Sequence, residues 1–208
     1  MSTPRARGVR RALALAVLAA APLVPRGAGA QATAPPRVRS EADVNFMSGM
    51  IPHHAQAVLI AGWARSHGAR NDVAILCDRI VVGQRDEIAL MQRWLRDRGE
   101  EVPAADATHH RMKMNGMTMD MLMPGMLNAE QLAALDKARG ADFDRLFLEA
   151  MIAHHAGAVS MVDELLSSPQ AANDDIVYRF ASDVYADQTT EIERMQKMLA
   201  TVPGAARP

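Results

Sequence analysis

A segment of sixteen residues that contains a histidine pair occurs twice in this chain, and this repetition constrains the fold most. The first copy covers residues 43–58 and the second covers residues 144–159, with no gap in the match. Asp, Phe, Met, Ile, His, His, Ala, Ala and Val recur at the same places in both copies. A repeat of this length indicates two copies of one supersecondary unit. The shared Met and His residues suggest two related metal sites or one shared site.

The repeat continues into a second segment of each half. A pattern of Gln, Glu, Ile, Met and Leu runs over residues 84–95 and recurs over residues 188–199. Both segments have the apolar spacing of amphipathic helices. Each half of the chain is therefore predicted to form a helical hairpin.

Helix start and stop signals predict four long helices. Their expected ranges are 40–66, 71–98, 142–167 and 173–201, and a short helix is expected over 128–140. No stretch has a convincing strand alternation. We therefore predict an all-α fold, a four-helix bundle made of two repeated helical hairpins joined by a methionine-rich linker.

The N-terminus predicts export. A basic start, an apolar run over residues 12–24 and the small residues Ala28-Gly29-Ala30 form a secretory signal peptide over residues 1–30, with cleavage after Ala30. No later stretch reaches the roughly 18 apolar residues of a membrane span. We expect a periplasmic or secreted protein with no transmembrane segment after signal removal.

The predicted domain organisation follows from these signals. Residues 31–39 are a flexible lead-in, residues 40–202 are the bundle domain and residues 203–208 are a tail. Within the bundle domain, repeat one covers 40–99, the methionine-rich linker covers 103–127 and repeat two covers 128–202.

Charge and cysteine content exclude several classes of protein. Removal of the five arginines in residues 1–30 leaves 18 basic against 24 acidic residues, a net charge of −6. Such an acidic chain is a poor nucleic-acid binder and a reasonable cation binder. Cys77 is the only cysteine, so no disulfide holds the fold, and we expect a small buried apolar residue there.

A helical wheel places several polar residues toward the bundle interior. Asp43, Met50 and His54 share one stripe, and Asp144, Met151 and His155 share the equivalent stripe, while His53 and His154 are expected to point toward the margin of the bundle. The partner helices point Gln84, Glu87, Met91, Gln188, Glu191 and Met195 inward. Two interpretations stay open: a metal site, or a His–Glu network that specifies helix register. Thioether and imidazole together suit copper, particularly Cu(I).

The linker between the halves is unusually rich in sulfur. Seven of the fifteen methionines lie in it, and its candidate metal ligands are His109, His110, Met112, Met114, Met117, Met119, Met121, Met123 and Met126. It is either an apolar flap that covers the bundle or a flexible thioether site that captures Cu(I).

These motifs resemble a bacterial family labelled domain of unknown function 305. The pattern D..F...MI.HH..A..M followed by Q..EI..M..WL, repeated, is typical of that family, and residues 91–95 of this chain match the end of the second motif. The resemblance covers about residues 40–200. Two departures are Lys197-Met198-Leu199, where Trp is common, and Val58-Leu59 in the first helix, where the third helix keeps Met161.

The resemblance implies a ferritin-like four-helix bundle. Some envelope members of the family bind copper and support copper resistance, so the resemblance also implies copper binding. By matching positions it implies His53, His54, His154, His155, Met50 and Met151 as metal ligands. Supporting or additional ligands are Asp43, Asp144, Glu87, Glu191, Gln84, Gln188, Met91 and Met195.

We therefore predict an exported protein that binds copper, Cu(I) in preference to Cu(II), for periplasmic buffering, transfer or resistance. Its expected partners are the metal ion and a copper-transfer protein of the envelope. An enzyme is not expected, because ferritin-like oxidases need Glu-x-x-His motifs and the chain has none. The alternative is a metal-responsive envelope stress chaperone or helical interaction module without tight copper binding.

Overall fold

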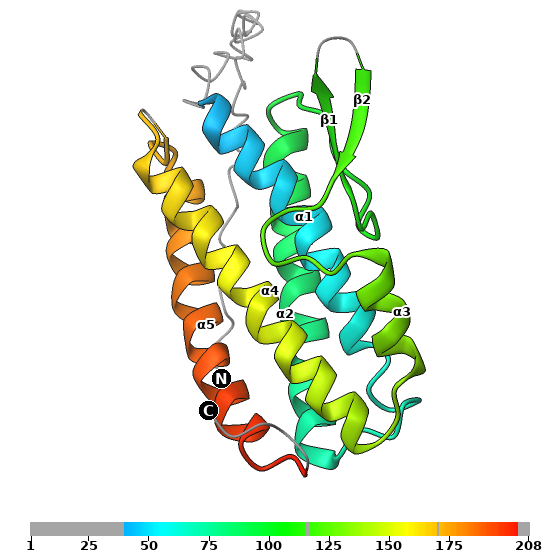
Figure 1. The fold of residues 1–208 in the computed structure, drawn as a ribbon. Helices are drawn as coiled ribbons and strands as arrows, with labels where there is room; N and C mark the ends of the chain where they lie inside the picture. The colour runs from blue at the N-terminus through cyan, green and yellow to red at the C-terminus, as the bar shows by residue number, and fades with distance from the viewer. Residues whose placement is uncertain (1–39, 115–116, 170, 204–208) are drawn as a thin grey trace, which may run out of the picture. The chain divides into compact units, whose positions relative to one another are not determined.

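Four long helices carry the two halves of the chain (Figure 1). The first half forms α1 (Glu41–Ala61) and α2 (Asn71–Arg96), and the second forms α4 (Ala141–Ser167) and α5 (Asp175–Leu199). Helix α1 packs on α2, α4 packs on α5, and α1 and α4 join the two pairs. The predicted all-α, ferritin-like bundle of two helical hairpins is confirmed.

The computed structural model describes residues 40–114, 117–169 and 171–203, all within the unit Pro36–Pro208. The predicted signal peptide over residues 1–30, the lead-in over 31–39 and residues 204–208 of the predicted tail lie outside the described residues. No helix in the described ranges is long and apolar enough to cross a membrane.

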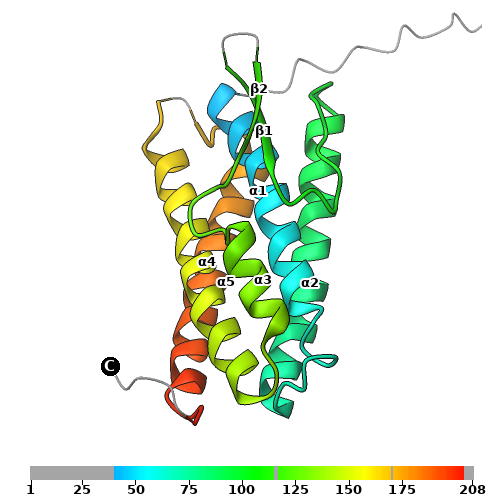
Figure 2. The same cartoon turned by 45° about the vertical axis from the view of Figure 1, so that its right-hand side comes forward.

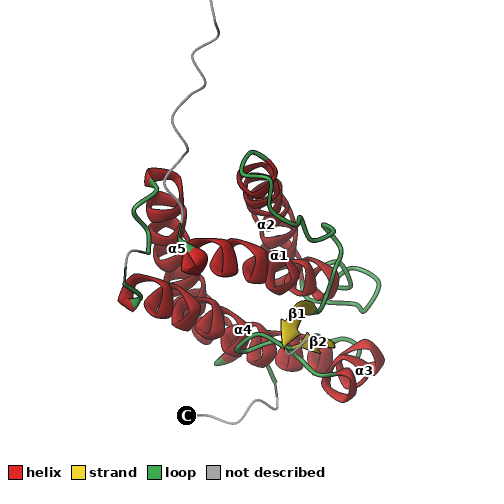
Figure 3. Cartoon of the chain, turned by 90° about the horizontal axis from the view of Figure 1, so that it is seen from above, coloured by secondary structure: helices red, strands yellow, loops and turns green. Residues whose placement is uncertain are grey.

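The linker contains two strands, whereas the sequence predicted none. Strands β1 (His110–Met114) and β2 (Met117–Met121) form an antiparallel hairpin, followed by the short helix α3 (Ala129–Lys137). The hairpin and α3 lie on one flank of the bundle, beside α1 and α4 (Figure 3). The alternating methionines were interpreted only as exposed thioethers, although alternation with a period of two also favours a strand. The Asn115-Gly116 dipeptide between the strands is a strong hairpin signal that the sequence analysis missed.

The bundle interior contains two apolar clusters rather than one continuous core. One cluster includes Phe46, Met50, Met91, Leu95, Met161 and Phe180, and the other includes Leu76, Phe143, Phe147, Leu148, Met151 and Met195. Along α1 the residues up to Ala55 belong to the first cluster, and those from Ala57 belong to the second. Along α4 the order is reversed, because the two helices run in opposite directions (Figure 1). Both histidine pairs fall at the boundary between the clusters.

The linker crosses the seam between α1 and α4 as a strap, which we define as residues 123–127 (Figure 2). The Gln56 side chain on α1 donates to the Leu127 carbonyl at 2.9 Å and accepts from the Leu127 amide at 2.7 Å. On α4, a Cβ atom at Gly157 would collide with the Pro124 carbonyl. Gly125 has a φ of +79°, a conformation that favours glycine, so the strap needs glycine on both sides of this contact.

We expect the Gly157→Ala substitution to destabilise the fold because the new methyl group must displace the strap. The expected loss in the free energy of unfolding is about 1–3 kcal/mol, the usual cost of overpacking, measured by urea denaturation. Gly83→Ala in α2 is the matched control, because a Cβ there meets no atom within 4 Å. This control should stabilise the protein by up to about 1 kcal/mol, since alanine is the better helix former. Equal stabilities of the two variants would contradict a tightly packed strap.

Candidate metal centre

The four histidines of the repeated pairs form a single buried layer between the two apolar clusters. All four side chains have 0% solvent exposure. The prediction that His53 and His154 lie at the bundle margin was therefore wrong. A helical wheel treats each helix alone, whereas here the strap covers the seam where these two residues meet.

His53 and His154 face each other across the contact between α1 and α4. Their ring centroids are 3.8 Å apart, with an angle of 42° between the ring planes. Nε2 of His53 lies 2.9 Å from the Pro124 carbonyl oxygen of the strap. A carbonyl can only accept, so the proton of His53 sits on Nε2. Its Nδ1 then has a free lone pair, and it has no partner in the structure.

His54 and His155 point instead toward the outer helices. Nε2 of His54 lies 2.7 Å from a carboxylate oxygen of Glu87 on α2, although this contact falls outside hydrogen-bond angles. Nε2 of His155 is hydrogen-bonded at 2.8 Å to a carboxylate oxygen of Glu191 on α5. Nδ1 of each ring is buried without a partner. A carboxylate on one ring nitrogen is the common arrangement that orients a histidine whose other nitrogen binds a metal.

Burial keeps the central two imidazoles neutral. Desolvation, followed by the proximity of His54, lowers the pKa of His53 from 6.5 to about 3. Desolvation and then the neighbouring His53 also lower the pKa of His154 well below its ordinary value. His154 lies near the His53 carbonyl, but neither of its ring nitrogens makes a hydrogen bond of normal geometry. Only a neutral imidazole can bind a metal, so these two rings stay competent in acid.

Buried sulfur atoms flank the layer on both sides. Met50 and Met151 are fully buried, each one helical turn before the second histidine of its pair. Met50 shares its apolar cluster with Met91, and Met151 shares the other cluster with Met195. The structure thus places one methionine pair above the imidazoles and one below.

The aspartates that begin the two copies of the repeat lie far from the imidazoles. Asp43 accepts from the Ala172 backbone amide at 2.6 Å, and Asp144 accepts from the Arg70 backbone amide at 3.2 and 3.3 Å. The second histidine of each pair lies eleven positions after the aspartate, which is roughly 16 Å along a helix. Both aspartates therefore hold hairpin loops, and neither joins the histidine layer.

Gln84 and Gln188 lie beside Glu87 and Glu191, on the side of the layer that faces away from the strap. Both amides are 4% exposed, and they line a cleft between α2 and α5 together with the two glutamates. The structure therefore brings these four predicted residues together.

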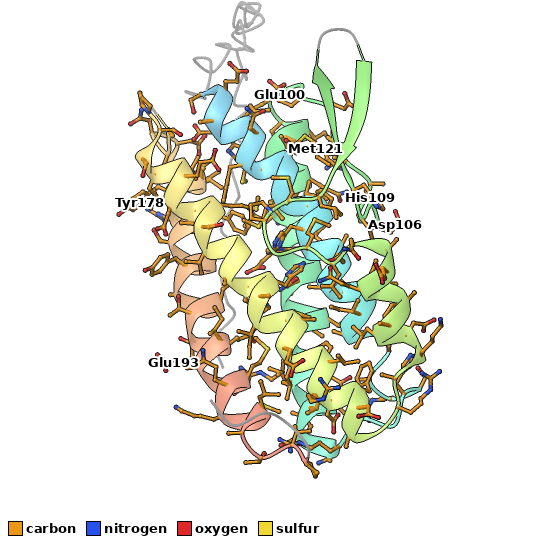
Figure 4. The ribbon with its side chains drawn as sticks, in the orientation of Figure 1. Glu100, Asp106, His109, Met121, Tyr178 and Glu193 are labelled. Atoms are coloured by element: carbon orange, nitrogen blue, oxygen red, sulfur yellow. The ribbon has the colours of Figure 1, made fainter. Side chains whose placement is uncertain are left out.

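The linker candidates divide into three groups. His109 is exposed and Met121 is 39% exposed, both on the flank that carries the hairpin (Figure 4). Met123 is partly buried and Met126 is buried, both within the strap. The side chains of His110, Met112, Met114, Met117 and Met119 lie outside the described part of the structure.

In the described ranges, no three His, Cys, Asp or Glu side chains converge as a preformed metal cluster. The available donors are instead unpartnered ring nitrogens of four buried histidines and the nearby thioethers. A buried ring nitrogen without a partner costs free energy, which a bound ion or water molecule would recover. Imidazole and thioether donors fit a soft metal ion.

Sequence reasoning missed the contribution of the strap. Pro124 and Leu127 contact the layer and its neighbour Gln56 through backbone atoms, which carry no residue-type signal. The available signal was the mismatch between the two copies, since Gln56 and Pro52 correspond to Gly157 and Ala153. A single strap that crosses two related helices must meet different residues on each.

Comparisons with known proteins identify the family and agree with the helical fold. The model of the family described as "Domain of unknown function (DUF305)" matches residues 43–199. No curated protein matches the chain. Among solved structures, a putative secreted DUF305 protein from Streptomyces coelicolor is 25% identical, with 80% of this chain and 97% of that chain covered and a TM-score of 0.67.

Two further structures are similar over the same region. A DUF305 fragment from Deinococcus radiodurans is 25% identical, with 77% of this chain and 97% of that chain covered and a TM-score of 0.63. CopM in its Cu(I)-bound form is 26% identical, with 78% of this chain and 98% of that chain covered and a TM-score of 0.58. CopM has also been solved in Cu(II)-bound and silver-bound forms.

The lowered pKa values predict that the metal-free protein loses stability in acid. The unfolded chain protonates His53 and His154 below about pH 6.5, whereas folded His53 binds its proton only near pH 3. The free energy of unfolding should therefore fall by about 1 kcal/mol per histidine for each pH unit below about 6. Urea denaturation at several pH values measures this slope. His154→Met should reduce the slope, and an unchanged slope would contradict a neutral buried pair.

Proposed function

This chain belongs to the DUF305 family, and on that premise we propose that it is an exported copper-binding protein whose histidine layer holds Cu(I). The observation that carries the proposal is the set of unpartnered Nδ1 atoms on His53, His54, His154 and His155. Nε2 of His53 and Nε2 of His155 are hydrogen-bonded to oxygen atoms, so a lone pair is left on Nδ1 of these rings, and Nε2 of His54 lies 2.7 Å from a Glu87 oxygen. Each of these nitrogens can donate its lone pair to a metal ion.

The chemistry of the surroundings favours copper over harder ions. Met50 and Met151 lie one turn from the histidine pairs, and thioethers bind Cu(I) while contributing little to magnesium or calcium. The layer is closed by the strap and by the apolar clusters, so an ion held there would have shed its water. Cu(I) gives up its water for nitrogen and sulfur ligands, and Cu(II) is the less suited ion here.

The similar structures support the same choice of metal. CopM has been solved with Cu(I), with Cu(II) and with silver, and silver shares the preference of Cu(I) for soft ligands. A relative from Streptomyces coelicolor is described as a putative secreted protein, in line with an exported role. Storage, delivery to an envelope copper-transfer protein and copper resistance are the roles we propose for such a site.

We assign the methionine hairpin to the capture of Cu(I) before it enters the bundle. Met112 pairs with Met119 and Met114 pairs with Met117 in the strand register. This register brings four methionines of the linker into two cross-strand pairs, and thioethers favour Cu(I). The strap follows the hairpin in the chain and contacts His53 through the Pro124 carbonyl, so it links the capture segment to the histidine layer in space.

The central test replaces two ligands without removing their carboxylate contacts. In the His54→Gln, His155→Gln double variant, the amide NH₂ can still donate to Glu87 and Glu191, but the Nδ1 lone pairs are lost. We expect Cu(I) affinity to fall about 100-fold or more, measured by anaerobic competition against a chelator.

The matched control for this test is His67→Gln, because His67 is also buried and bonded to an aspartate, Asp136, outside the layer. The control should bind Cu(I) like the wild type. Equal affinities of the double variant and the control would reject the histidine layer as the site. A wild-type protein that binds no copper and suppresses client aggregation would instead favour the chaperone alternative.

A second test separates capture from storage. Deletion of residues 110–121 removes the hairpin and leaves the strap, and the register pairs His110 with Met121, so the two ends lie close together. We expect Cu(I) uptake to slow while bound copper at equilibrium and helical circular dichroism stay near wild-type values. Replacement of Met112, Met114, Met117 and Met119 by leucine keeps the hairpin without its four paired thioethers and should also slow uptake. Unchanged uptake in both variants, followed by stopped flow, would contradict the capture role.

A further inference from the structure

A second polar feature lies between α2 and α5, on the other side of the bundle from α3 and the strap (Figure 3). It is a cleft of about 230 Å³, large enough for several water molecules. Gln84 and Glu87 line it from α2, and Asp187, Gln188 and Glu191 line it from α5. The proposed copper site makes no use of Gln84, Gln188 or Asp187.

The two amides are the features that most need explanation. Gln84 and Gln188 are each 4% exposed, and both line the cleft. Neither the oxygen nor the nitrogen of the Gln84 amide has a hydrogen-bond partner, and the Gln188 oxygen has none. A buried amide without a partner costs about 1–3 kcal/mol, so a purely structural role is expensive at both positions.

The three carboxylates of the cleft differ in their exposure to solvent. The Glu87 and Glu191 side chains are 24% and 21% exposed and contact the histidines at their inner ends, while Asp187 is exposed at the mouth. Partial desolvation, and then the Glu87 and Glu191 carboxylates, raise the pKa of Asp187. This direction indicates that the negative charges repel one another, and a bound cation would relieve the repulsion.

Two arginines also line the cleft but do not neutralise it. Arg79 and Arg194 are exposed, and neither makes an ion pair within the described ranges of the chain. Three carboxylates against two arginines leave the lining with net negative charge. The cleft therefore favours a cation over an anion.

We propose that this cleft is a binding site for a hydrated divalent cation, which contacts the amide oxygens of Gln84 and Gln188 and is bound through its water shell by the carboxylates that line the cleft. Amide and carboxylate oxygens are the donors that hard divalent ions prefer, in contrast to the soft donors of the histidine layer. No three carboxylate or histidine side chains converge in the described ranges, so the ion keeps part of its water shell here. The site goes beyond copper binding, although Glu87 and Glu191 also contact His54 and His155 of the histidine layer.

Mn²⁺ is the probe for this site, because its electron paramagnetic resonance signal reports binding directly and it prefers oxygen donors. Titration of the metal-free, full-length protein after signal removal should reveal one Mn²⁺ site. The Asp187→Asn variant should weaken Mn²⁺ binding about tenfold. Glu193→Gln is the matched control: it makes the same charge change on α5, but Glu193 is exposed and does not line the cleft (Figure 4).

A second variant removes the amides without endangering the fold. In Gln84→Leu, Gln188→Leu, apolar groups replace two buried amides, three of whose four polar atoms lack partners, so the melting temperature should rise or stay unchanged. Mn²⁺ binding should be lost in this variant, while Cu(I) affinity stays at the wild-type value. Mn²⁺ affinities equal to those of Glu193→Gln in both cleft variants would overturn the proposal, as would the absence of Mn²⁺ binding to the wild type. These Mn²⁺ titrations use metal-free protein with all four histidines in place, so their outcome is read separately from that of the copper proposal.

Discussion

The burial of four imidazoles between two apolar clusters is the constraint on which this structure depends. Desolvation keeps His53 and His154 neutral, and hydrogen bonds to oxygen place the proton of His53 and the proton of His155 on Nε2. The unpartnered nitrogens left by this arrangement cost stability in the metal-free chain. A fold that retains such a layer spends free energy of folding on it, as folds commonly do at functional sites.

The strap explains why the two copies of the repeat are not identical. The two helices α1 and α4 cross at equivalent residues, but only one linker passes over the crossing. One helix therefore offers Gln56 to bond the strap backbone, and the other offers Gly157 to make room for it. The same linker gives His53 a carbonyl partner and leaves His154 without one, so the two halves of the layer are chemically unequal.

Most of the helical fold was predictable from the sequence, because apolar spacing and cap residues are local signals. The observed helices begin within two residues of their expected starts, and only α1 ends clearly earlier than expected. The pairing of His54 with Glu87 also followed from which residues share a face. The contact between His53 and His154, the strap and the hairpin did not follow, because they depend on which segments meet in space. A wheel drawn for one helix cannot include the chain that covers it.

The aspartates at the ends of the bundle have a consequence for how the halves stay aligned. Asp43 of the first half holds the loop amide of Ala172 in the second half, and Asp144 of the second half holds the loop amide of Arg70 in the first. A shift of one hairpin along the other by a single turn, about 5.4 Å, would break both contacts together. These reciprocal stops at opposite ends fix the axial position of α1 against α4. The meeting of the imidazoles at the midpoint is therefore determined by two carboxylates that never touch them.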